Sequence, residues 1–256
     1  MPSKTRKTRS RRRKRRRRRT APPERVAIIT GAAGGLGKVV SRDLAAAGMR
    51  LALVGSRRAP LEKLGAGLGL APDQWMAADA DLRDRAAAGA VVDAVADRFG
   101  RTDVLVHLVG GYHGGHPVVE VPDAEVEAML SQHLWTTLNM VRAVVPRMTE
   151  AGWGRVAAVS SPMAATPGKS VAPYAVGKAA QEALLGGLAR EVAGTGVTVN
   201  VVLVRQIDVK HERDANPSPK NEWWTTPEEI SATIGYLLSE DASAINGAKI
   251  PLYGNA

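Results

Sequence analysis

The sequence predicts an α/β fold, a doubly wound, seven-stranded parallel sheet in a single domain. Seven short apolar runs recur along the chain, stretches with helical periodicity separate them, and 45% of the 256 residues are hydrophobic. This length and composition are sufficient for one buried core. Strands that alternate with helices are typical of βαβ units, in which helices on the faces of the sheet connect consecutive parallel strands.

The strands are predicted from runs that are apolar at nearly every position rather than at every second one. This pattern indicates strands that are buried on both faces, as in a parallel sheet. The predicted strands cover residues 26–30, 50–55, 75–78, 104–109, 155–160, 197–204 and 248–252.

The helices are predicted from apolar spacing and from capping residues. A helix over residues 38–47 follows the first strand, and Gly48 and Gly100 are expected to end two helices. Thr226-Pro227-Glu228-Glu229 provides an N-cap, a proline at the first helical position and a glutamate at the third, which predicts a helix from Pro227 to about Leu238. One helical face is formed by Ala88, Val91, Val92, Val95 and Phe99.

The formal net charge of +10 belongs to the N-terminal tail. Of the 35 Lys and Arg residues, 13 lie in the first 20 residues, which contain no Asp or Glu; beyond Thr20, 22 basic residues face 25 acidic ones. Residues 1–23 are therefore predicted to be a disordered, Arg-rich tail, and residues 24–256 to be the folded domain. The tail is expected to be dispensable for catalysis; binding to nucleic acid or to an anionic surface is the alternative.

The composition excludes every site that needs cysteine, and it argues against a membrane span and a secretory signal. The chain has no cysteine, so it has no disulfide, no thiolate metal site and no cysteine nucleophile. No run approaches the roughly 18 apolar residues of a membrane span, and the basic N-terminus lacks the apolar segment of a secretory signal. We expect a cytoplasmic protein without a membrane span or a metal.

A glycine cluster follows the first predicted strand and leads into a predicted helix. Glycines at this point permit a tight turn and let backbone N–H groups approach a pyrophosphate at the positive end of the helix dipole. Considered alone, the cluster also fits a turn of small residues that binds nothing. The cluster comprises Thr30-Gly31-Ala32-Ala33-Gly34-Gly35-Leu36-Gly37.

This T-G-x-x-x-G-x-G spacing resembles the cofactor loop of the short-chain dehydrogenase/reductase family, and further family features recur across residues 24–256. The most specific is Tyr174-x-x-x-Lys178, with Ser161 thirteen residues upstream. Asp81-Leu82 resembles the pair that contacts adenine, and Gly110 lies where the family carries N-N-A-G. The resemblance implies a Rossmann-type fold, an NAD(P) cofactor contacted by Thr30, Gly31, Gly35, Leu36 and Gly37, and a homodimer or homotetramer.

Tyr174 and Lys178 are i and i+4 on a predicted helix, hence neighbours on one face. An ammonium about 4 Å from a phenol contributes about 4 kcal/mol at an effective dielectric near 20, enough to lower a phenol pKa of about 10 by two to three units. The resemblance implies that Tyr174 exchanges a proton with a carbonyl or alcohol oxygen. It also implies that Lys178 lowers the pKa of Tyr174 and holds the nicotinamide ribose, and that Ser161 aligns the substrate oxygen. Considered singly, Ser161 could be a helix cap.

The chain departs from the family pattern near the expected nicotinamide site. His107 replaces the first asparagine of N-N-A-G, where it either keeps a polar contact to neighbouring backbone or is a satisfied core histidine. His133 lies where the family has a catalytic asparagine. We predict that His133 substitutes in a proton relay, with a titration close to its ordinary pKa near 6.5; the alternative is a histidine that caps or packs. Val204-Arg205 replaces the usual P-G, and Ile207 remains where a backbone contact to the carboxamide is expected.

The cofactor preference is predicted from the end of the second strand. Val54-Gly55-Ser56-Arg57-Arg58 has no acid that would accept bonds from the 2′-OH of NAD. A hydroxyl and guanidinium groups suit a 2′-phosphate, so Ser56 and Arg57 predict that NADP(H) is preferred over NAD(H). The alternative is a solvated basic turn.

The sequence thus predicts an NADP(H)-dependent oxidoreductase that interconverts a small-molecule carbonyl and an alcohol. A catalytically weak nucleotide-binding regulatory protein of the same fold is the first alternative, and a nucleic-acid-binding module driven by the tail is the second. The substrate is left open. Residues 208–225 occupy the family's lid position, and Trp223-Trp224 within them faces either a bulky apolar substrate or a subunit interface. Residues 111–116 are candidates for the opposite wall.

Overall fold

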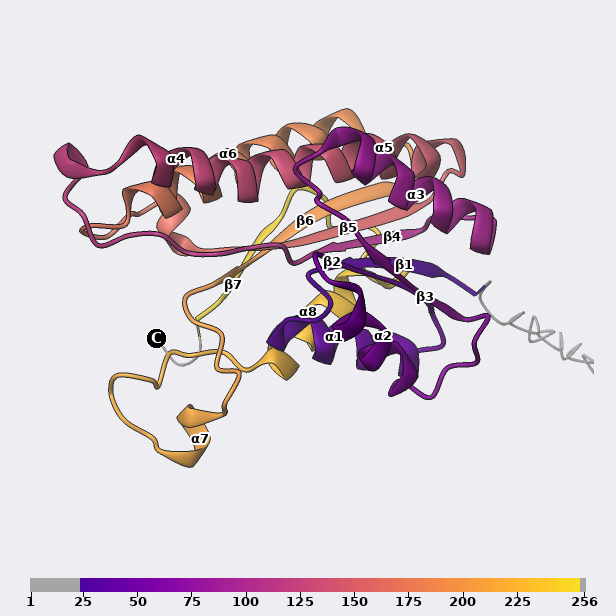
Figure 1. Cartoon of the computed structure of the whole chain (residues 1–256), viewed down its shortest axis with the longest axis horizontal. Helices are drawn as coiled ribbons and strands as arrows, with labels where there is room; N and C mark the ends of the chain where they lie inside the picture. Colours follow the sequence, from indigo (N-terminus) through magenta and orange to yellow (C-terminus); the bar gives the residue numbers. More distant parts are fainter. Residues whose placement is uncertain (1–23, 254–256) are drawn as a thin grey trace, which may run out of the picture.

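The computed structural model describes residues 24–253 and contains a seven-stranded parallel sheet with the order β3-β2-β1-β4-β5-β6-β7 (Figure 1). The order reverses direction between β1 and β4, which is the switch point at which doubly wound sheets bind their ligands. The strands are β1 (Val26–Thr30), β2 (Arg50–Gly55), β3 (Trp75–Asp79), β4 (Val104–His107), β5 (Gly154–Ser160), β6 (Val197–Val204) and β7 (Lys249–Leu252).

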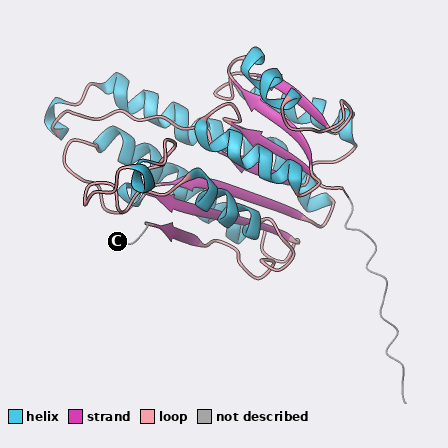
Figure 2. Cartoon of the chain, turned by 90° about the horizontal axis from the view of Figure 1, so that it is seen from below, coloured by secondary structure: helices cyan, strands magenta, loops and turns pink. Residues whose placement is uncertain are grey.

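Helices cover both faces of the sheet, as Figures 1 and 2 show from two directions. Helices α3, α5 and α6 pack on one face, and α1, α2 and α8 on the other. The helices are α1 (Gly35–Ala46), α2 (Arg58–Ala66), α3 (Arg85–Phe99), α4 (Asp123–Leu130), α5 (Thr136–Glu150), α6 (Ala172–Glu191), α7 (Glu212–Ala215) and α8 (Pro227–Leu237).

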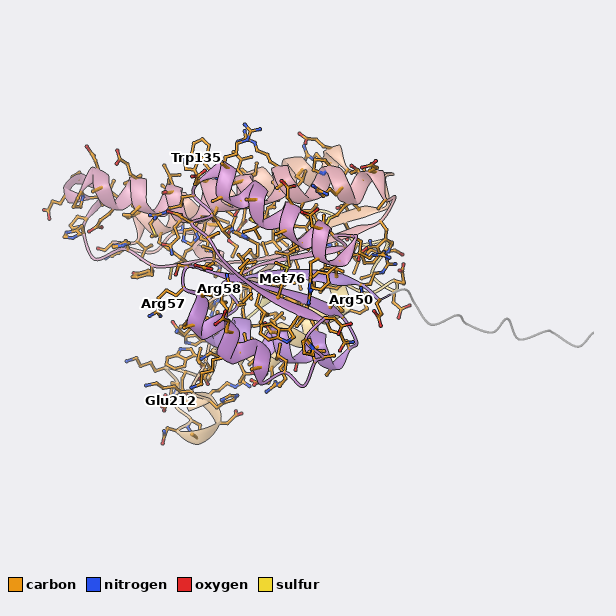
Figure 3. The ribbon with its side chains drawn as sticks, turned by 45° about the vertical axis from the view of Figure 1, so that its right-hand side comes forward. Arg50, Arg57, Arg58, Met76, Trp135 and Glu212 are labelled. Carbon is orange, nitrogen blue, oxygen red and sulfur yellow. The ribbon has the colours of Figure 1, made fainter. Side chains whose placement is uncertain are left out.

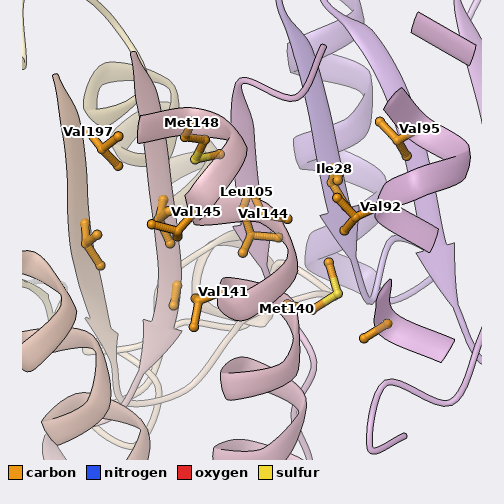
Figure 4. Packing of buried hydrophobic residues seen from close by; sticks show 14 of the residues in the cluster. Ile28, Val92, Val95, Leu105, Met140, Val141, Val144, Val145, Met148 and Val197 are labelled. Carbon is orange, nitrogen blue, oxygen red and sulfur yellow. The ribbon is translucent and has the colours of Figure 1, made fainter. Parts of the chain in front are cut away.

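Each face of the sheet has its own apolar core. On the α3, α5 and α6 face, Ile28 and Leu105 of the sheet pack against Val92, Met140 and Val144 (Figure 4). Fully burying such a side chain contributes roughly 1.5–3 kcal/mol. The predicted face of α3, from Ala88 to Phe99, is buried in this core. The two-sided burial explains the continuous apolar runs of the strands.

The predicted fold class, α/β with a seven-stranded parallel sheet in one domain, is confirmed. The capping box of α8 is present as expected, and Gly100 ends α3 in the left-handed conformation. Two boundaries were wrong by more than one residue. The fourth strand ends at His107, because its β1 partner ends at Thr30 and the chain then turns along the cleft. The first helix begins at Gly35, since the end of the glycine loop already forms its first turn.

The predicted tail, residues 1–23, lies outside the described residues. Within residues 24–253, no helix combines the length and apolar content needed to cross a membrane.

Candidate active site

A cleft of about 680 Å³ lies at the carboxyl ends of the central strands. This volume falls in the range of small-molecule and cofactor sites. The cleft is lined by the glycine loop, by residues 108–112 after β4, by His133, and by Val159, Ser160 and Met163 around the end of β5. Tyr174 and Lys178 of α6 and residues 204–207 and 209, at and after the end of β6, complete the lining. Strand order therefore brings together motifs that are up to about 180 residues apart in the sequence.

The glycine loop forms one end of the cleft, and two of its glycines, Gly31 and Gly37, are sterically required. Gly31 has a φ of +67°, and a Cβ there would lie 2.9 Å from the Leu108 carbonyl oxygen. A Cβ on Gly37 would overlap the backbone of Gly31 and Ala32. Gly34, the N-cap of α1, has no side chain to cap the helix, so its first-turn N–H groups are available to an anion. The loop fits a cofactor phosphate.

Leu82 and Asp81 lie on the loop after β3, where adenine contacts were expected. Leu82 is buried, and the Asn139 side-chain amide of α5 donates hydrogen bonds to the carbonyl oxygens of Leu82 (3.1 Å) and Arg83 (3.0 Å). Arg83 also bonds the Asp81 carboxylate and lowers its pKa. Sequence analysis missed the role of Asn139 because its partners are backbone atoms about 56 residues away.

Ser56 and Arg57 follow the end of β2, and Arg58 is the first residue of α2. Figure 3 shows the two arginines side by side. The Arg58 guanidinium donates to Glu62 and to Asp79 of β3, both at 2.9 Å, and its hydrogen bond to Asp79 lowers the pKa of that carboxyl. Arg57 is exposed and has no carboxylate partner within residues 24–253. Sequence analysis missed Asp79, which β2–β3 pairing places beside Gly55.

Tyr174 lies half-buried in the cleft wall, with its ring centroid 5.3 Å from that of Tyr112 and 5.6 Å from that of His133. Burial raises the pKa of Tyr174, Tyr112 adds to the rise, and the nearby Ser161 hydroxyl opposes it. We expected Lys178 to lower this pKa. That expectation was wrong for this structure, because the loss of solvation of the phenolate dominates.

Lys178 is buried beside Tyr174 on the same helix, and its ammonium is committed to other partners. Its Nζ donates to the Val159 carbonyl oxygen (2.8 Å) and to the Gln181 Oε1 (3.1 Å). Burial lowers the pKa of Lys178 to about 7, although Glu182 opposes the shift. Near neutral pH the lysine is therefore only partly charged, which weakens any effect on Tyr174.

Ser161 is buried at the end of β5 and is the N-cap of a 3-10 turn, Pro162–Ala164. Its Oγ accepts a hydrogen bond from the Met163 N–H at 3.3 Å. The capping interpretation is thus confirmed. It is compatible with a role at Tyr174, since the Ser161 hydroxyl also affects the pKa of that residue.

His133 lies in a π-helical turn, Ser131–Trp135, between α4 and α5. Such turns are frequent at functional sites. The buried ring donates from Nε2 to the Gly111 carbonyl oxygen at 3.2 Å, and its Nδ1 has no hydrogen-bond partner among the described residues. Burial, with Lys178 nearby, lowers the pKa of His133 to about 3. The expected titration near pH 6.5 was therefore wrong, because the site does not solvate an imidazolium.

A hydrogen-bonded chain connects Lys178 with the backbone of His133. Gln181, which accepts from Lys178, donates from Nε2 to the Thr137 Oγ1 at 2.9 Å, and Thr137 donates to the His133 carbonyl oxygen at 2.6 Å. Sequence analysis missed Gln181 and Thr137. The available signal was helical spacing, since Gln181 follows Lys178 by three residues and Thr137 follows His133 by four.

With this geometry in place, a family comparison decides the class of the protein. The family model described as short chain dehydrogenase matches residues 25–220, more than half of the chain. The chain is a short-chain dehydrogenase/reductase.

Relatives of this short-chain dehydrogenase/reductase include 1,6-dihydroxycyclohexa-2,4-diene-1-carboxylate dehydrogenase of Pseudomonas putida, 32% identical over 90% of this chain and 91% of that protein. D-threitol dehydrogenase of Mycolicibacterium smegmatis is 30% identical, over 90% and 92%. The crystal structure of levodione reductase is 29% identical, with a TM-score of 0.81 over 90% and 96%. The protein is therefore an NAD(P)-dependent oxidoreductase that interconverts carbonyl and alcohol groups.

The enzyme departs from its family's asparagine at His107, which lies in the core. Its Nδ1 is 3.0 Å from the Thr30 Oγ1 and its Nε2 is 3.2 Å from the Thr136 Oγ1. Burial lowers its pKa to about 3. His107 thus joins the first strand to α5 through side-chain hydroxyls, and of the two interpretations the satisfied core histidine is confirmed.

Residues 208–225, in the lid position, project beyond the sheet with α7 (Figure 1). The buried Asp208 carboxylate accepts the N–H groups of Glu212 and Arg213, each at 2.8 Å. Trp223 and Trp224 pack edge-to-face on one another, 6.3 Å apart, and neither lines the cleft. The segment is therefore held by polar contacts, both within itself at Asp208 and to α8, where the Arg213 guanidinium donates to Glu229.

Of the other residues predicted from the sequence to lie at the site, only some line the cleft. Gly110, Gly111 and Tyr112 line it, and so do Val204, Arg205 and Ile207. His113 and His116 of the proposed opposite wall do not. Within residues 24–253, no group of three or more His, Asp or Glu residues is arranged to hold a metal ion.

Proposed function

We propose that this reductase uses NADP(H) and that Tyr174 exchanges the proton with the substrate oxygen. The observation that carries the proposal is that one cleft has a glycine cradle at one end and Tyr174, Lys178 and the neighbouring Ser161 at the other. The bound cofactor supplies or accepts a hydride at its nicotinamide ring.

The cradle and the segments beside it hold the cofactor in this proposal. The first-turn amides of α1 bind the phosphates, the Leu82 loop receives adenine, and the backbone of Ile207 contacts the carboxamide. The proposed cofactor residues are Thr30, Gly31, Gly35, Leu36, Gly37, Ser56, Arg57, Asp81, Leu82, Gly110, Tyr174, Lys178 and Ile207.

In the reductive direction Tyr174 donates its phenolic proton to the carbonyl oxygen as hydride adds to the carbonyl carbon, and in oxidation it accepts the alcohol proton. Its raised pKa keeps the phenol protonated at neutral pH, so the proton is present, but the rise also makes the phenol a weaker acid, which the Ser161 hydroxyl opposes. Ser161 donates a hydrogen bond that aligns the substrate oxygen.

The third N–H donor of Lys178, which neither Val159 nor Gln181 uses, holds the ribose hydroxyls and, through them, the position of the nicotinamide. His133 acts as a neutral relay group: its Nε2–H is held by Gly111, which leaves Nδ1 as an unpartnered acceptor within the described structure. A water molecule held there would connect the lysine with solvent without any change in the charge of His133.

NADP(H) is preferred over NAD(H) because Arg57 is free to bind a 2′-phosphate while Arg58 neutralises Asp79. Arg57→Gln should reduce the ratio of NADPH to NADH affinity about tenfold, since charge-assisted hydrogen bonds contribute roughly 1.5–3 kcal/mol. Arg190→Gln, at an exposed position on α6, should leave the ratio unchanged. Equal affinities for both cofactors in the unmodified protein would favour a solvated basic turn.

The function is tested by a panel of carbonyl compounds assayed by consumption of NADPH and NADH. Reduction of at least one compound, lost in Tyr174→Phe, is the expected result. Cofactor binding without any turnover would instead support the catalytically weak regulatory protein. That alternative is favoured by the departures around the nicotinamide end, in particular the burial of His107 and His133.

The family resemblance further suggests a homodimer or homotetramer in the cytoplasm. Sedimentation at micromolar concentration should show more than monomer, and a monomer alone would remove the assembly without affecting the proposed chemistry.

A further inference from the structure

Arg205 occupies the second position of the family's usual P-G pair, directly after β6, and it lines the cleft. Glycine at this position would leave the wall uncharged, whereas this chain places a guanidinium there. The Arg205 side chain is exposed and has no carboxylate partner within residues 24–253. Its charge is therefore not neutralised by a carboxylate of the described residues.

Two aromatic rings from separate segments hold the Arg205 guanidinium. Its Cζ lies 4.9 Å from the ring centroid of Tyr253, which follows β7, and 5.9 Å from that of Trp223 near the end of the lid. Such cation–π contacts restrict the long side chain while leaving its N–H donors in the plane of the guanidinium available. The arginine is therefore positioned before any ligand arrives.

The remainder of the cleft contributes no competing charge. None of the residues that line it is Asp or Glu, and the other lining cation, Lys178, already donates to Val159 and Gln181. Tyr112 and Met163 of the wall near Tyr174 offer mainly apolar surface. A ligand in this cleft thus meets one unused, bidentate anion-binding group and an apolar surface.

We propose that the substrate of this reductase carries a carboxylate that Arg205 binds while its carbonyl group lies at Tyr174. The proposal rests on the proposed function and adds the substrate class. A planar guanidinium matches a carboxylate through two parallel N–H···O bonds. The cofactor diphosphate has its own site at the first turn of α1, so it does not need Arg205.

The turnover test compares 4-formylbenzoate with methyl 4-formylbenzoate, which has the same carbonyl but no charge. The unmodified enzyme should favour the acid in kcat/KM by about 10- to 100-fold, in line with a charge-assisted pair. Arg205→Gln should abolish this preference by raising KM for the acid, with NADPH affinity changed less than twofold. Arg205→Lys should retain part of the preference for the acid. Lys220 is an exposed cation of residues 208–225 that does not line the cleft, so Lys220→Gln should retain the whole preference.

A binding test remains informative if the enzyme reduces neither aldehyde. Benzoate titrated into the enzyme saturated with NADP⁺ should bind more tightly than benzamide, and this difference should disappear in Arg205→Gln. No turnover together with Arg205-dependent benzoate binding would count against the proposed function and for the carboxylate site. The carboxylate proposal would be overturned if the unmodified enzyme bound benzoate no more tightly than benzamide. It would also be overturned if Arg205→Gln lowered kcat/KM equally for the acid and the ester, or weakened NADPH binding.

Discussion

The two ends of the cleft are built from different kinds of contact. The glycine-loop end consists of backbone, held by close approaches such as that between Gly31 and Leu108. The Tyr174 end consists of buried side chains joined by hydrogen bonds, among them Lys178, Gln181 and Thr137. A backbone site tolerates no added atom, whereas a side-chain network tolerates a replacement that preserves its hydrogen bonds. This difference fits the chain's departures from the family pattern, which replace side chains such as that at His133 but none of the glycines of the loop.

The largest effect is expected at the backbone end. Gly37→Ala places a Cβ against the backbone of Gly31 and Ala32, so it should lower the free energy of unfolding by about 1–3 kcal/mol and weaken NADPH binding more than 100-fold. Thermal unfolding and fluorescence titration measure the two effects. Gly89→Ala in α3, where a Cβ meets no atom within 4 Å, should instead stabilise the protein by about 0.5–1 kcal/mol. Similar behaviour of the two variants would contradict the comparison.

Acid should destabilise the protein through two buried histidines, His133 at the Tyr174 end of the cleft and His107 in the core. His107 and His133 have pKa values of about 3 in the folded protein, against an ordinary 6.5. Because only the unfolded chain binds these protons, the free energy of unfolding falls as the pH drops from 6.5 towards 3, by on the order of 3 kcal/mol per histidine at pH 4. Melting temperatures between pH 7 and pH 4 test this, and His133→Asn should remove about half of the loss. An unchanged slope in that variant would show that His133 is solvated.

A smaller effect is expected on turnover at His133. His133→Ala removes both the Gly111 bond and the free Nδ1, so kcat should fall about tenfold while NADPH affinity stays within twofold. His133→Asn, which restores a polar group, should recover much of the rate. Steady-state kinetics and cofactor titration separate the two parameters. A normal kcat in His133→Ala would leave His133 as a packing residue only.

The smallest effect is expected for the N-terminal tail. Removal of residues 1–22 should leave kcat and KM within about twofold, because the predicted chemistry lies wholly in the folded domain. Loss of activity in a truncated protein that still folds would contradict this. Salt-sensitive retention on nucleic acid that disappears with the tail would assign the tail a separate binding role.

The same contrast governs how much the sequence could predict. The sheet and the glycine loop were predictable because continuous apolar runs and glycine spacing are local signals of backbone geometry. Tyr174, Lys178 and Ser161 were predictable from a family pattern. The pKa values were not predictable, because burial at tertiary contacts sets them. Spacing predicts a charged Lys178 that lowers the pKa of Tyr174. In the structure, burial raises the pKa of Tyr174 and lowers the pKa of Lys178 to about 7. Gln181 and Asn139 carry no motif, so only their contacts reveal their roles.

The most direct test compares single-turnover hydride transfer and cofactor affinity in the unmodified protein and in Tyr174→Phe. The measurement follows NADPH oxidation with saturating carbonyl substrate, and titrates NADPH separately. We expect hydride transfer to slow by about 10²- to 10⁴-fold, the contribution typical of a positioned acid, with NADPH affinity within twofold. An unchanged rate of transfer in Tyr174→Phe would contradict the assignment of the proton donor on which the whole account of the cleft rests.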